Sequence, residues 1–343
     1  MLLSKYFLLK FIKKVINMTL NEMRAVVIDR FGGPEVLSIR NVPILEPKPD
    51  QILVKVDSAG IGVWDNIERE GMLAKMSGTK AKFPWILGSE GAGKIVDIGD
   101  NVSRFRIGDL VYGHIWTPTE ATKAGFYAEY AVLNENHAWQ IPSNIGTKQA
   151  GALLIDGATA FRGLDDTLAI KKDESLMIFG ASGGLGHLAV QLGKRLGAKV
   201  FAVASGEDGV ALALRLGAEA AVDGHTGNIV DLAKEFAPDG FDAALITVAG
   251  DVSEKALTTM RNGGRVAYPW VNQRPPPKSP TNVSLSGYNG NLDHDLIINM
   301  NRLIEAGTFE VHLGKTFPLE QVVEGFKTVV SHHLGRLAVF PNI

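Results

Sequence analysis

The chain of 343 residues contains no cysteine. Disulfide bonds, thiolate nucleophiles and every zinc site that uses a cysteine ligand are therefore excluded. The chain also lacks an excess of charge, because 35 Lys and Arg stand against 37 Asp and Glu, for a formal net charge of −2. This balance excludes nucleic-acid binding driven by bulk positive charge, and we expect no nucleic-acid partner.

Long hydrophobic runs are absent as well, so no segment is expected to span a bilayer. Residues 1–22 carry apolar side chains that could share one helix face opposite several lysines, which is typical of a helix lying on a membrane surface. A cleaved signal peptide is disfavoured, because lysines interrupt the apolar run and no small-residue cleavage site follows. We favour a simple N-terminal extension before a fold that begins at Met23, in a cytoplasmic protein.

The stretch from Ser175 to Leu192 predicts a strand, a glycine-rich turn and a helix. Leu176–Phe179 is an apolar run typical of a buried parallel strand, and apolar residues recur at helical spacing after the turn. Glycines in such a turn let the backbone approach a pyrophosphate, which the free N–H groups of the helix start then bind. Their spacing is Gly-x-x-Gly-x-x-Gly, a weak signal alone. We predict cofactor contacts at Gly180, Ser182, Gly183, Gly184, Leu185 and Gly186.

The pattern of secondary structure changes near Lys148. Before it, many short strands with glycine turns indicate a small barrel. After it, strands and helices alternate as far as Trp270, which predicts a doubly wound parallel sheet. The expected strands are Leu176–Phe179, Val200–Ala204, Ala220–Val222, Ala243–Val248 and Val266–Tyr268, and the expected helices lie near 184–197, 208–217, 228–237 and 252–261. Two later helices, Asp293–Ala306 and Glu320–Ser331, precede a last strand, Arg336–Phe340, that should return to the first domain.

Nine motifs, taken in their order along the chain, carry a resemblance to a known protein family. They are Phe31-Gly-Gly-Pro-Glu-Val-Leu37, Ala59-Gly-Ile-Gly-Val-Trp-Asp65, Leu87-Gly-Ser-Glu-Gly-Ala-Gly93, Val96-Asp-Ile-Gly99, Arg106-Ile-Gly-Asp-Leu-Val-Tyr-Gly113, Gly125-Phe-Tyr-Ala-Glu-Tyr130, Gly157-Ala-Thr-Ala160, the glycine turn and Gly335-Arg-Leu-Ala-Val339. Over residues 23–343 the chain resembles the medium-chain dehydrogenase/reductase superfamily, in its zinc-free quinone oxidoreductase and enone reductase branch. The resemblance implies an α/β protein with a GroES-like barrel as catalytic domain (23–148, completed by about 300–343), a Rossmann cofactor-binding domain (149–299) and a homodimer.

Three positions decide the expectation for metal. Relatives that use zinc have ligands where this chain has Gly62, Ser89 and Ile155. Glycine and isoleucine have no ligand atom in their side chains, and serine is a poor zinc ligand. Glu90 and His114 offer another pair, but two ligands without a third are more often a hydrogen-bonded pair. We therefore predict that the protein holds no metal.

Without zinc, no Lewis acid would ionise an alcohol. Reduction of a quinone or an activated C=C needs less help, because the acceptor is already electrophilic and must mainly be held against the nicotinamide. A hydrogen-bond donor to the developing oxyanion would assist. The resemblance supplies no matching donor, since Gly62 replaces the asparagine common in zinc-free relatives. The local candidates are Tyr127, Asn66 and Trp64; Trp64 is better explained as a wall of the site, and Asp65 as a helix cap.

The end of the second Rossmann strand bears on the choice of cofactor. NAD-preferring proteins often have a carboxylate there, about 20 residues past the glycine turn. This chain has Ala204 and Ser205 instead, which favours NADPH over NADH. Glu207 and Asp208 follow at once and would favour NADH if Glu207 turned toward the ribose. No Lys or Arg lies in this loop to bind a 2′-phosphate.

The resemblance adds two cofactor residues, Thr159 near the nicotinamide and Arg336 at the edge of the cofactor. The chain is thus predicted to be a zinc-independent, NADPH-dependent oxidoreductase that transfers hydride to a quinone or an α,β-unsaturated carbonyl. Two alternatives stay open. One is a trans-2-enoyl thioester reductase, which needs a channel for a pantetheine arm. The other is a dinucleotide-binding structural or regulatory protein with little turnover.

Overall fold

The computed structural model describes residues 22–115, 124–270 and 276–342. The predicted extension therefore lies outside the described residues, except that Glu22 already belongs to the first strand, one residue before the expected start. The chain divides into two compact units. Unit 1 comprises the chain up to Gln140, Phe317–Lys327 and Val339–Ile343, and unit 2 comprises Ile141–Thr316 and Thr328–Ala338. The domain bounds drawn from the sequence stay a prediction.

Unit 1 is built mainly of short strands. One sheet has the order β2-β1-β4, from β1 (Glu22–Ile28), β2 (Ser38–Pro43) and β4 (Trp85–Ile86). The other has the order β15-β16-β3-β5-β6-β8, with β7 paired to β3, from β3 (Gln51–Ile61), β5 (Glu90–Ile98), β6 (Leu110–His114), β7 (Tyr130–Asn134), β8 (Ala138–Gln140), β15 (Leu313–Pro318) and β16 (Arg336–Phe340). The division of the chain falls within the last two strands, so residues 313–316 and 336–338 are counted with unit 2. Short helices follow the strands, namely α2 (Val63–Arg69), α3 (Met72–Ser77) and α11 (Val322–Thr328).

Glycine permits the close pairing of β3 with β5. A Cβ on Gly93 would lie 2.0 Å from the carbonyl oxygen of Lys55 on the facing strand. A residue with a side chain at this position would force the strands apart. Behind the smaller sheet, Met23, Val27 and Ala128 belong to a separate apolar cluster that buries one face of β1.

Unit 2 is organised around a six-stranded, wholly parallel sheet of order β11-β10-β9-β12-β13-β14. Its strands are β9 (Ser175–Phe179), β10 (Lys199–Ala204), β11 (Ala220–Asp223), β12 (Phe241–Ile246), β13 (Met260–Pro269) and β14 (Ser284–Tyr288). Its helices are α4 (Thr147–Ala150), α5 (Leu154–Arg162), α6 (Gly184–Arg195), α7 (Gly206–Arg215), α8 (Ile229–Phe236), α9 (Asp251–Ala256) and α10 (His294–Glu305). The strand order reverses between β9 and β12, where folds of this kind bind their ligands.

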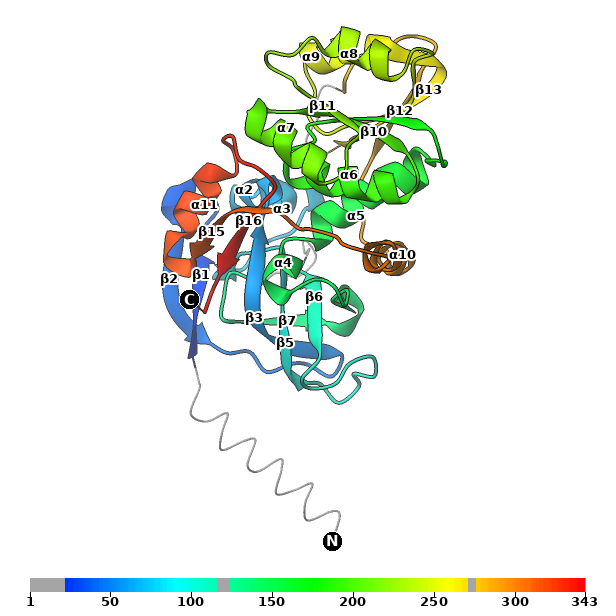
Figure 1. The fold of residues 1–343 in the computed structure, drawn as a ribbon. Helices are drawn as coiled ribbons and strands as arrows, with labels where there is room; N and C mark the ends of the chain where they lie inside the picture. Colours follow the sequence, from blue (N-terminus) through cyan, green and yellow to red (C-terminus); the bar gives the residue numbers. More distant parts are fainter. Residues whose placement is uncertain (1–21, 116–123, 271–275, 343) are drawn as a thin grey trace. The chain divides into compact units, whose positions relative to one another are not determined.

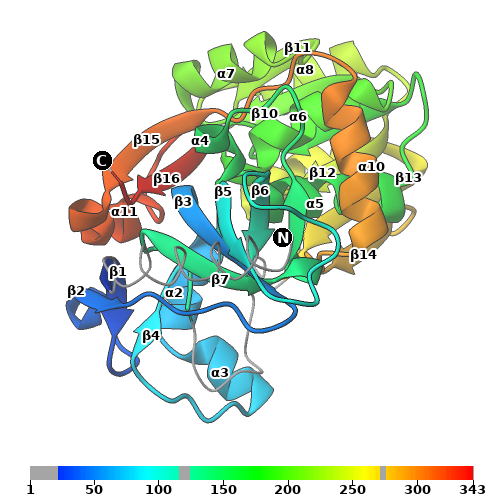
Figure 2. The same cartoon turned by 90° about the horizontal axis from the view of Figure 1, so that it is seen from below.

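Helices cover both faces of the parallel sheet. On one face, α8 and α9 close an apolar core in which Phe201, Phe236 and Phe241 meet at ring-centroid distances of 5.4–5.9 Å. The other face is covered by α5, α6 and α7 (Figure 1). Figure 2 shows α10 beside α5, in agreement with their packing. Because both faces are buried, the strands are continuously apolar rather than alternating.

The predicted α/β class and doubly wound sheet are confirmed. All five expected strands are present as β9 to β13, while β14 was not expected. Two predicted helices are shorter than expected: α9 ends at Ala256 and continues as a 3-10 turn, and α11 ends at Thr328. Among the residues that the structure describes, no helix has the length and apolar character needed to cross a membrane.

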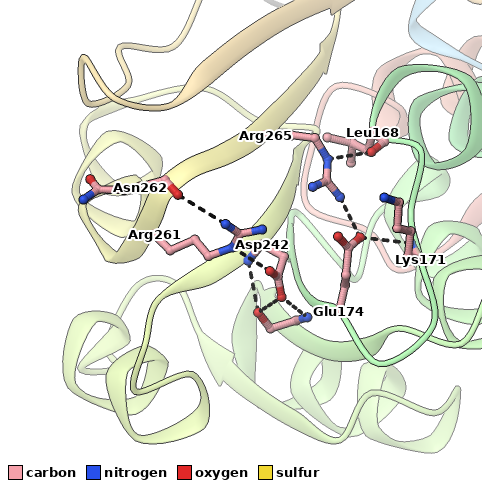
Figure 3. A network of polar contacts seen from close by, with 8 residues as sticks. Leu168, Lys171, Glu174, Asp242, Arg261, Asn262 and Arg265 are labelled. Atoms are coloured by element: carbon pink, nitrogen blue, oxygen red, sulfur yellow. Dashed lines mark hydrogen bonds and ion pairs between the residues drawn. The ribbon is translucent and has the colours of Figure 1, made fainter.

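A polar network joins the beginnings of the strands β9, β12 and β13 (Figure 3). The Asp242 carboxylate accepts hydrogen bonds from the N–H and hydroxyl of Ser175, at 2.8 and 2.9 Å, and from Arg261 Nε at 2.6 Å. Partial burial raises the pKa of Asp242, but the bonds from Ser175 and Arg261 outweigh it and leave the pKa below its usual value. Nearby, Arg265 links Glu174 to the carbonyl of Leu168. The network fixes the register of three strands at the edge opposite the glycine turn.

We predict that Asp242→Ala lowers the free energy of unfolding by about 2 kcal/mol, because it leaves the Ser175 donors and Arg261 without their shared acceptor. Chemical denaturation measures the change. Asp239→Ala, at an exposed position in the loop just before β12, is the matched control and should leave stability unchanged. Equal stability of both variants would contradict the role given to the network.

Candidate cofactor-binding site

The glycine turn lies between β9 and α6, and two of its glycines are required by the protein itself. Gly180 has φ +84°, and a Cβ there would lie 2.2 Å from Thr247 Oγ1. A Cβ on Gly186 would lie 2.0 Å from the Gly180 carbonyl oxygen. Leu185, between these constraints, is buried. The first turn of α6 is thereby packed directly against the end of β9.

Gly183 is different, because no neighbouring group of unit 2 demands a glycine there. Its φ of −81° suits any residue, and an added Cβ would meet only the Gly180 carbonyl oxygen, at 3.6 Å. The space in front of Gly183 is therefore open, at the start of a twelve-residue helix. N–H groups at a helix start have no partner within the helix and attract anions. The turn thus has the open backbone surface that a pyrophosphate needs.

His187 was not predicted as a site residue, but it holds this turn in place. Its ring Nε2 accepts the His312 N–H at 3.2 Å, so Nδ1 carries the proton and donates to the Gly183 carbonyl at 2.9 Å. Burial lowers the pKa of His187 to about 4, which keeps the ring neutral. Its partners are backbone groups, which every residue has, so the sequence carried no specific signal for His187.

Arg336 lies close to the turn in a buried ion pair. It donates from Nη1 to Asp156 Oδ2 at 2.7 Å and from Nε to the Ala152 carbonyl at 2.9 Å. A Cβ on Gly184 would lie 2.6 Å from that Asp156 oxygen, so the pair fills the space beside the first turn of α6. Burial raises the pKa of Asp156, while the charge of Arg336 opposes the rise. Contact of Arg336 with a cofactor stays a prediction.

The end of β10 lies beside the turn. Ser182 is buried, and its hydroxyl accepts the Ser205 N–H at 3.1 Å. Ala204 is buried in the sheet. The Gly206 N–H is bound by Asp223 Oδ1 at 3.0 Å, so the side chain of Ser205 is the group that the loop presents. The predicted residues of the turn and of the second strand are thus brought together.

Two histidines far from this loop in the sequence contact the Ser205 hydroxyl. His225 Nε2 lies 3.0 Å away and His332 Nδ1 lies 3.3 Å away. The helix expected to extend to Ser331 ends at Thr328, and His332 lies in the segment beyond it. Arg215, the nearest basic residue in the sequence after this loop, is instead paired with Glu310. Glu207 and Asp208 are exposed in the first turn of α7.

A cavity of about 290 Å³ opens next to His225. It lies between the start of α8 and the start of α9, on the side of the sheet where the strands end. Asn228, Asp251 and Lys255 contribute polar groups to its wall, and Ile229 and Val252 contribute apolar ones. A planar base would find both kinds of contact there.

Thr159 lies on α5, one turn after Asp156. Its hydroxyl donates to the Ile155 carbonyl at 2.7 Å and is buried. A Cβ on Gly290 would lie 2.6 Å from that hydroxyl, so a loop after β14 approaches Thr159 closely. Contact between Thr159 and a nicotinamide stays a prediction.

In unit 1, a buried carboxylate organises the residues proposed for catalysis. Asp65 Oδ2 accepts the Gly62 N–H and the Tyr127 hydroxyl, both at 2.9 Å, and Oδ1 accepts the Ser89 hydroxyl at 2.8 Å. Asp65 thus caps α2 from the third helical position, with Gly62 as the N-cap residue. The Tyr127 hydroxyl is fully buried and also lies 3.0 Å from the Gly60 carbonyl, which gives it a structural part.

The two other candidates lie on the same short helix, α2. Trp64 is buried, with its indole against Gly62. Asn66 is half-buried, and its amide lies 3.5 Å from the Phe326 carbonyl, a long contact for a hydrogen bond. The Asn66 donor is therefore more weakly engaged than the Tyr127 hydroxyl.

Comparison with known proteins agrees with both units. Residues 48–143 match the alcohol dehydrogenase GroES-like domain, and residues 184–285 match the zinc-binding dehydrogenase family. The chain is 31% identical to a human quinone oxidoreductase, over 90% of this chain and 94% of that protein. The chain belongs to the medium-chain dehydrogenase/reductase superfamily. The GroES-like and Rossmann architecture expected from the sequence is thereby confirmed.

Two more superfamily members are similar over most of the chain. An NADPH-dependent alkenal/one oxidoreductase of Arabidopsis thaliana chloroplasts is 30% identical, over 93% of this chain and 80% of that protein. The crystal structure of an alcohol dehydrogenase superfamily protein from Novosphingobium aromaticivorans is 27% identical, with a TM-score of 0.79, over 93% of this chain and 99% of that one. The protein is accordingly an oxidoreductase of the quinone oxidoreductase and enone reductase kind.

The family matched by residues 184–285 is described as zinc-binding, so the structure around the ligand-like positions bears on metal binding. A Cβ on Gly62 would lie 2.3 Å from the Trp64 indole, and Ser89 is bonded to Asp65. Glu90 and His114 face each other on paired strands. Within the described ranges, no three His, Asp or Glu side chains are grouped as a metal site. The absence of zinc stays a prediction.

The contrast between two glycines of the turn gives a prediction. Gly183→Ala should keep the melting temperature but weaken binding of NADPH at least about tenfold, because its methyl group enters the space left for the pyrophosphate. Gly186→Ala should instead lower stability by about 2 kcal/mol through overpacking against Gly180. Thermal melts and fluorescence titrations measure both effects. Unchanged NADPH affinity in Gly183→Ala would show that the phosphates bind elsewhere.

Proposed function

We propose that this protein is a zinc-independent oxidoreductase that uses NADPH to reduce a quinone or an α,β-unsaturated carbonyl. The observation that carries the proposal is the open backbone at Gly183 beside Ser205, on a turn and a strand end that carry no acidic side chain. The cofactor supplies the hydride, and the chain binds and orients it. The main-chain N–H groups at the start of α6 would hold the pyrophosphate.

The acceptor is proposed from the relatives. Quinone oxidoreductase and NADPH-dependent alkenal/one oxidoreductase, as those proteins are named, act on electrophilic acceptors. Such acceptors need a donor for the oxyanion rather than a Lewis acid. Asn66 is the proposed donor, because Asp65 and Gly60 engage the Tyr127 hydroxyl. Trp64 would then be a wall of the site. A homodimer and a cytoplasmic location are kept as proposals from the resemblance and the sequence.

The decisive experiment follows the oxidation of NADPH by the purified chain against a panel of quinones, enones and enoyl thioesters. Turnover of quinones or enones is expected, with kcat lowered in Asn66→Ala and less affected in Tyr127→Phe. Preference for enoyl thioesters would favour the second enzyme class. NADPH binding without turnover of any acceptor would favour a regulatory protein.

The metal prediction has its own test. Purified protein should contain no stoichiometric zinc, and treatment with a chelator should leave its activity unchanged, since the positions of Gly62, Ser89 and Ile155 offer no suitable ligand set. Elemental analysis that finds about one tightly bound zinc per chain would overturn this.

The preference for NADPH is tested at Ser205. Ser205→Asp should shift the ratio of kcat/KM for NADPH over NADH toward NADH by about tenfold or more, because a carboxylate repels the 2′-phosphate and binds the ribose hydroxyls. Ser77→Asp, on the surface of unit 1, is the control and should keep the wild-type ratio. A wild-type protein that clearly prefers NADH would contradict the predicted choice.

A further inference from the structure

The surroundings of Ser205 contain charges that change with pH and charges that do not. Ser205 makes contact, among the described side chains, with two histidines and with no Lys or Arg. A serine hydroxyl has one proton, so it can donate to only one of the two ring nitrogens, and the other ring must present an N–H to it. In the cluster of Ser205, His225 and His332, one ring N–H therefore already points at the Ser205 oxygen.

The fixed charges near this cluster are negative. Asp223 accepts hydrogen bonds from the N–H groups of His225 and Gly206 and from the Thr226 hydroxyl, and these bonds hold the pKa of its carboxyl below the usual value. Asp208 Oδ2 lies 3.8 Å from His332 Nε2.

Two further titratable groups in the same segments are Glu207 and His333. Glu207 is exposed in the first turn of α7. His333, next to His332 in the chain, turns its Nδ1 to the Ser331 carbonyl, 2.9 Å away. With the histidines neutral, the carboxylates dominate the field at Ser205.

We infer that protonation of His225 and His332 controls the choice of cofactor, so that the preference for NADPH over NADH rises as the pH falls. Histidine side chains ordinarily gain their charge between about pH 8 and pH 5. Neutral rings leave a site whose carboxylates repel a 2′-phosphate but tolerate the ribose hydroxyls of NADH. Two imidazolium rings offset those carboxylates and donate to the phosphate oxygens. This inference rests on the proposed function, because it takes the Ser205 cluster as the site of the 2′-position.

The phosphate itself works in the opposite direction, since phosphate monoesters lose their second charge near about pH 6. The test therefore compares proteins at the same pH. Dissociation constants of NADPH and NADH are measured by titration of the full chain at about pH 6 and about pH 8.5, which bracket the titration of histidine. NADH, which has no 2′-phosphate, reports any general effect of pH on the fold.

The wild-type ratio of the two constants should move toward NADPH by about tenfold between the higher and the lower pH, as expected for new charge-assisted bonds. The double variant His225→Gln and His332→Asn keeps neutral donors and acceptors near Ser205 and should lose this change. His332→Arg carries a permanent charge and should keep a high preference for NADPH at both pH values. His294→Gln, at an exposed histidine at the start of α10, should behave as wild type.

A double variant with the same pH dependence as wild type would overturn the inference. A ratio that does not depend on pH in the wild type, with both nucleotides bound, would also overturn it but leave the proposed function standing. Failure of the wild-type chain to bind either nucleotide at any pH would overturn both.

Discussion

The hydrogen bond from the Ser205 N–H to the Ser182 hydroxyl is the constraint on which the candidate site depends. It joins the glycine turn to the end of the neighbouring strand, so the two places where a dinucleotide would be held cannot move independently. The Ser182 carbonyl also accepts the Gly335 N–H at 2.8 Å, which brings the segment of His332 to the same point. One buried serine thus places three distant segments around one surface. Since each bond is made within unit 2, the site is formed by the parallel sheet and its loops alone.

In both units, a buried carboxylate fixes the positions of the groups that donate to it. Asp65 gathers donors from three segments of unit 1, and Asp156 fixes Arg336 beside the helix that follows the glycine turn. A carboxylate removed from water is stable only when its lone pairs are satisfied, so each one dictates where its donors must lie. The chain uses these groups to position backbone.

Local features of the fold could be predicted from the sequence, and long-range ones could not. The glycine turn and the strands β9 to β13 are contiguous signals of apolar runs and glycines, and each was found. The strand β14 was not predicted, because Ser284–Tyr288 has no apolar run and becomes a strand only by pairing with β13. His225 and His332 are separated from Ser205 by 20 and 127 residues, so no pattern in one chain reveals their contact. A capping part for Asp65 could be expected because its donor, the Gly62 N–H, lies three residues away, although the N-cap residue itself is Gly62.

The surroundings of Gly62 leave no room for a side chain at this position. The indole of Trp64 occupies the space in which any side chain at that position would lie, while the Gly62 N–H is held by Asp65. Installing a cysteine ligand there would require the buried indole to leave its place, and a histidine in place of Ser89 would remove the hydroxyl that Asp65 accepts. Placing metal ligands at these two positions would therefore require concerted changes of at least these neighbours. Because these positions are coupled, each single substitution toward a metal site would be expected to destabilise the fold.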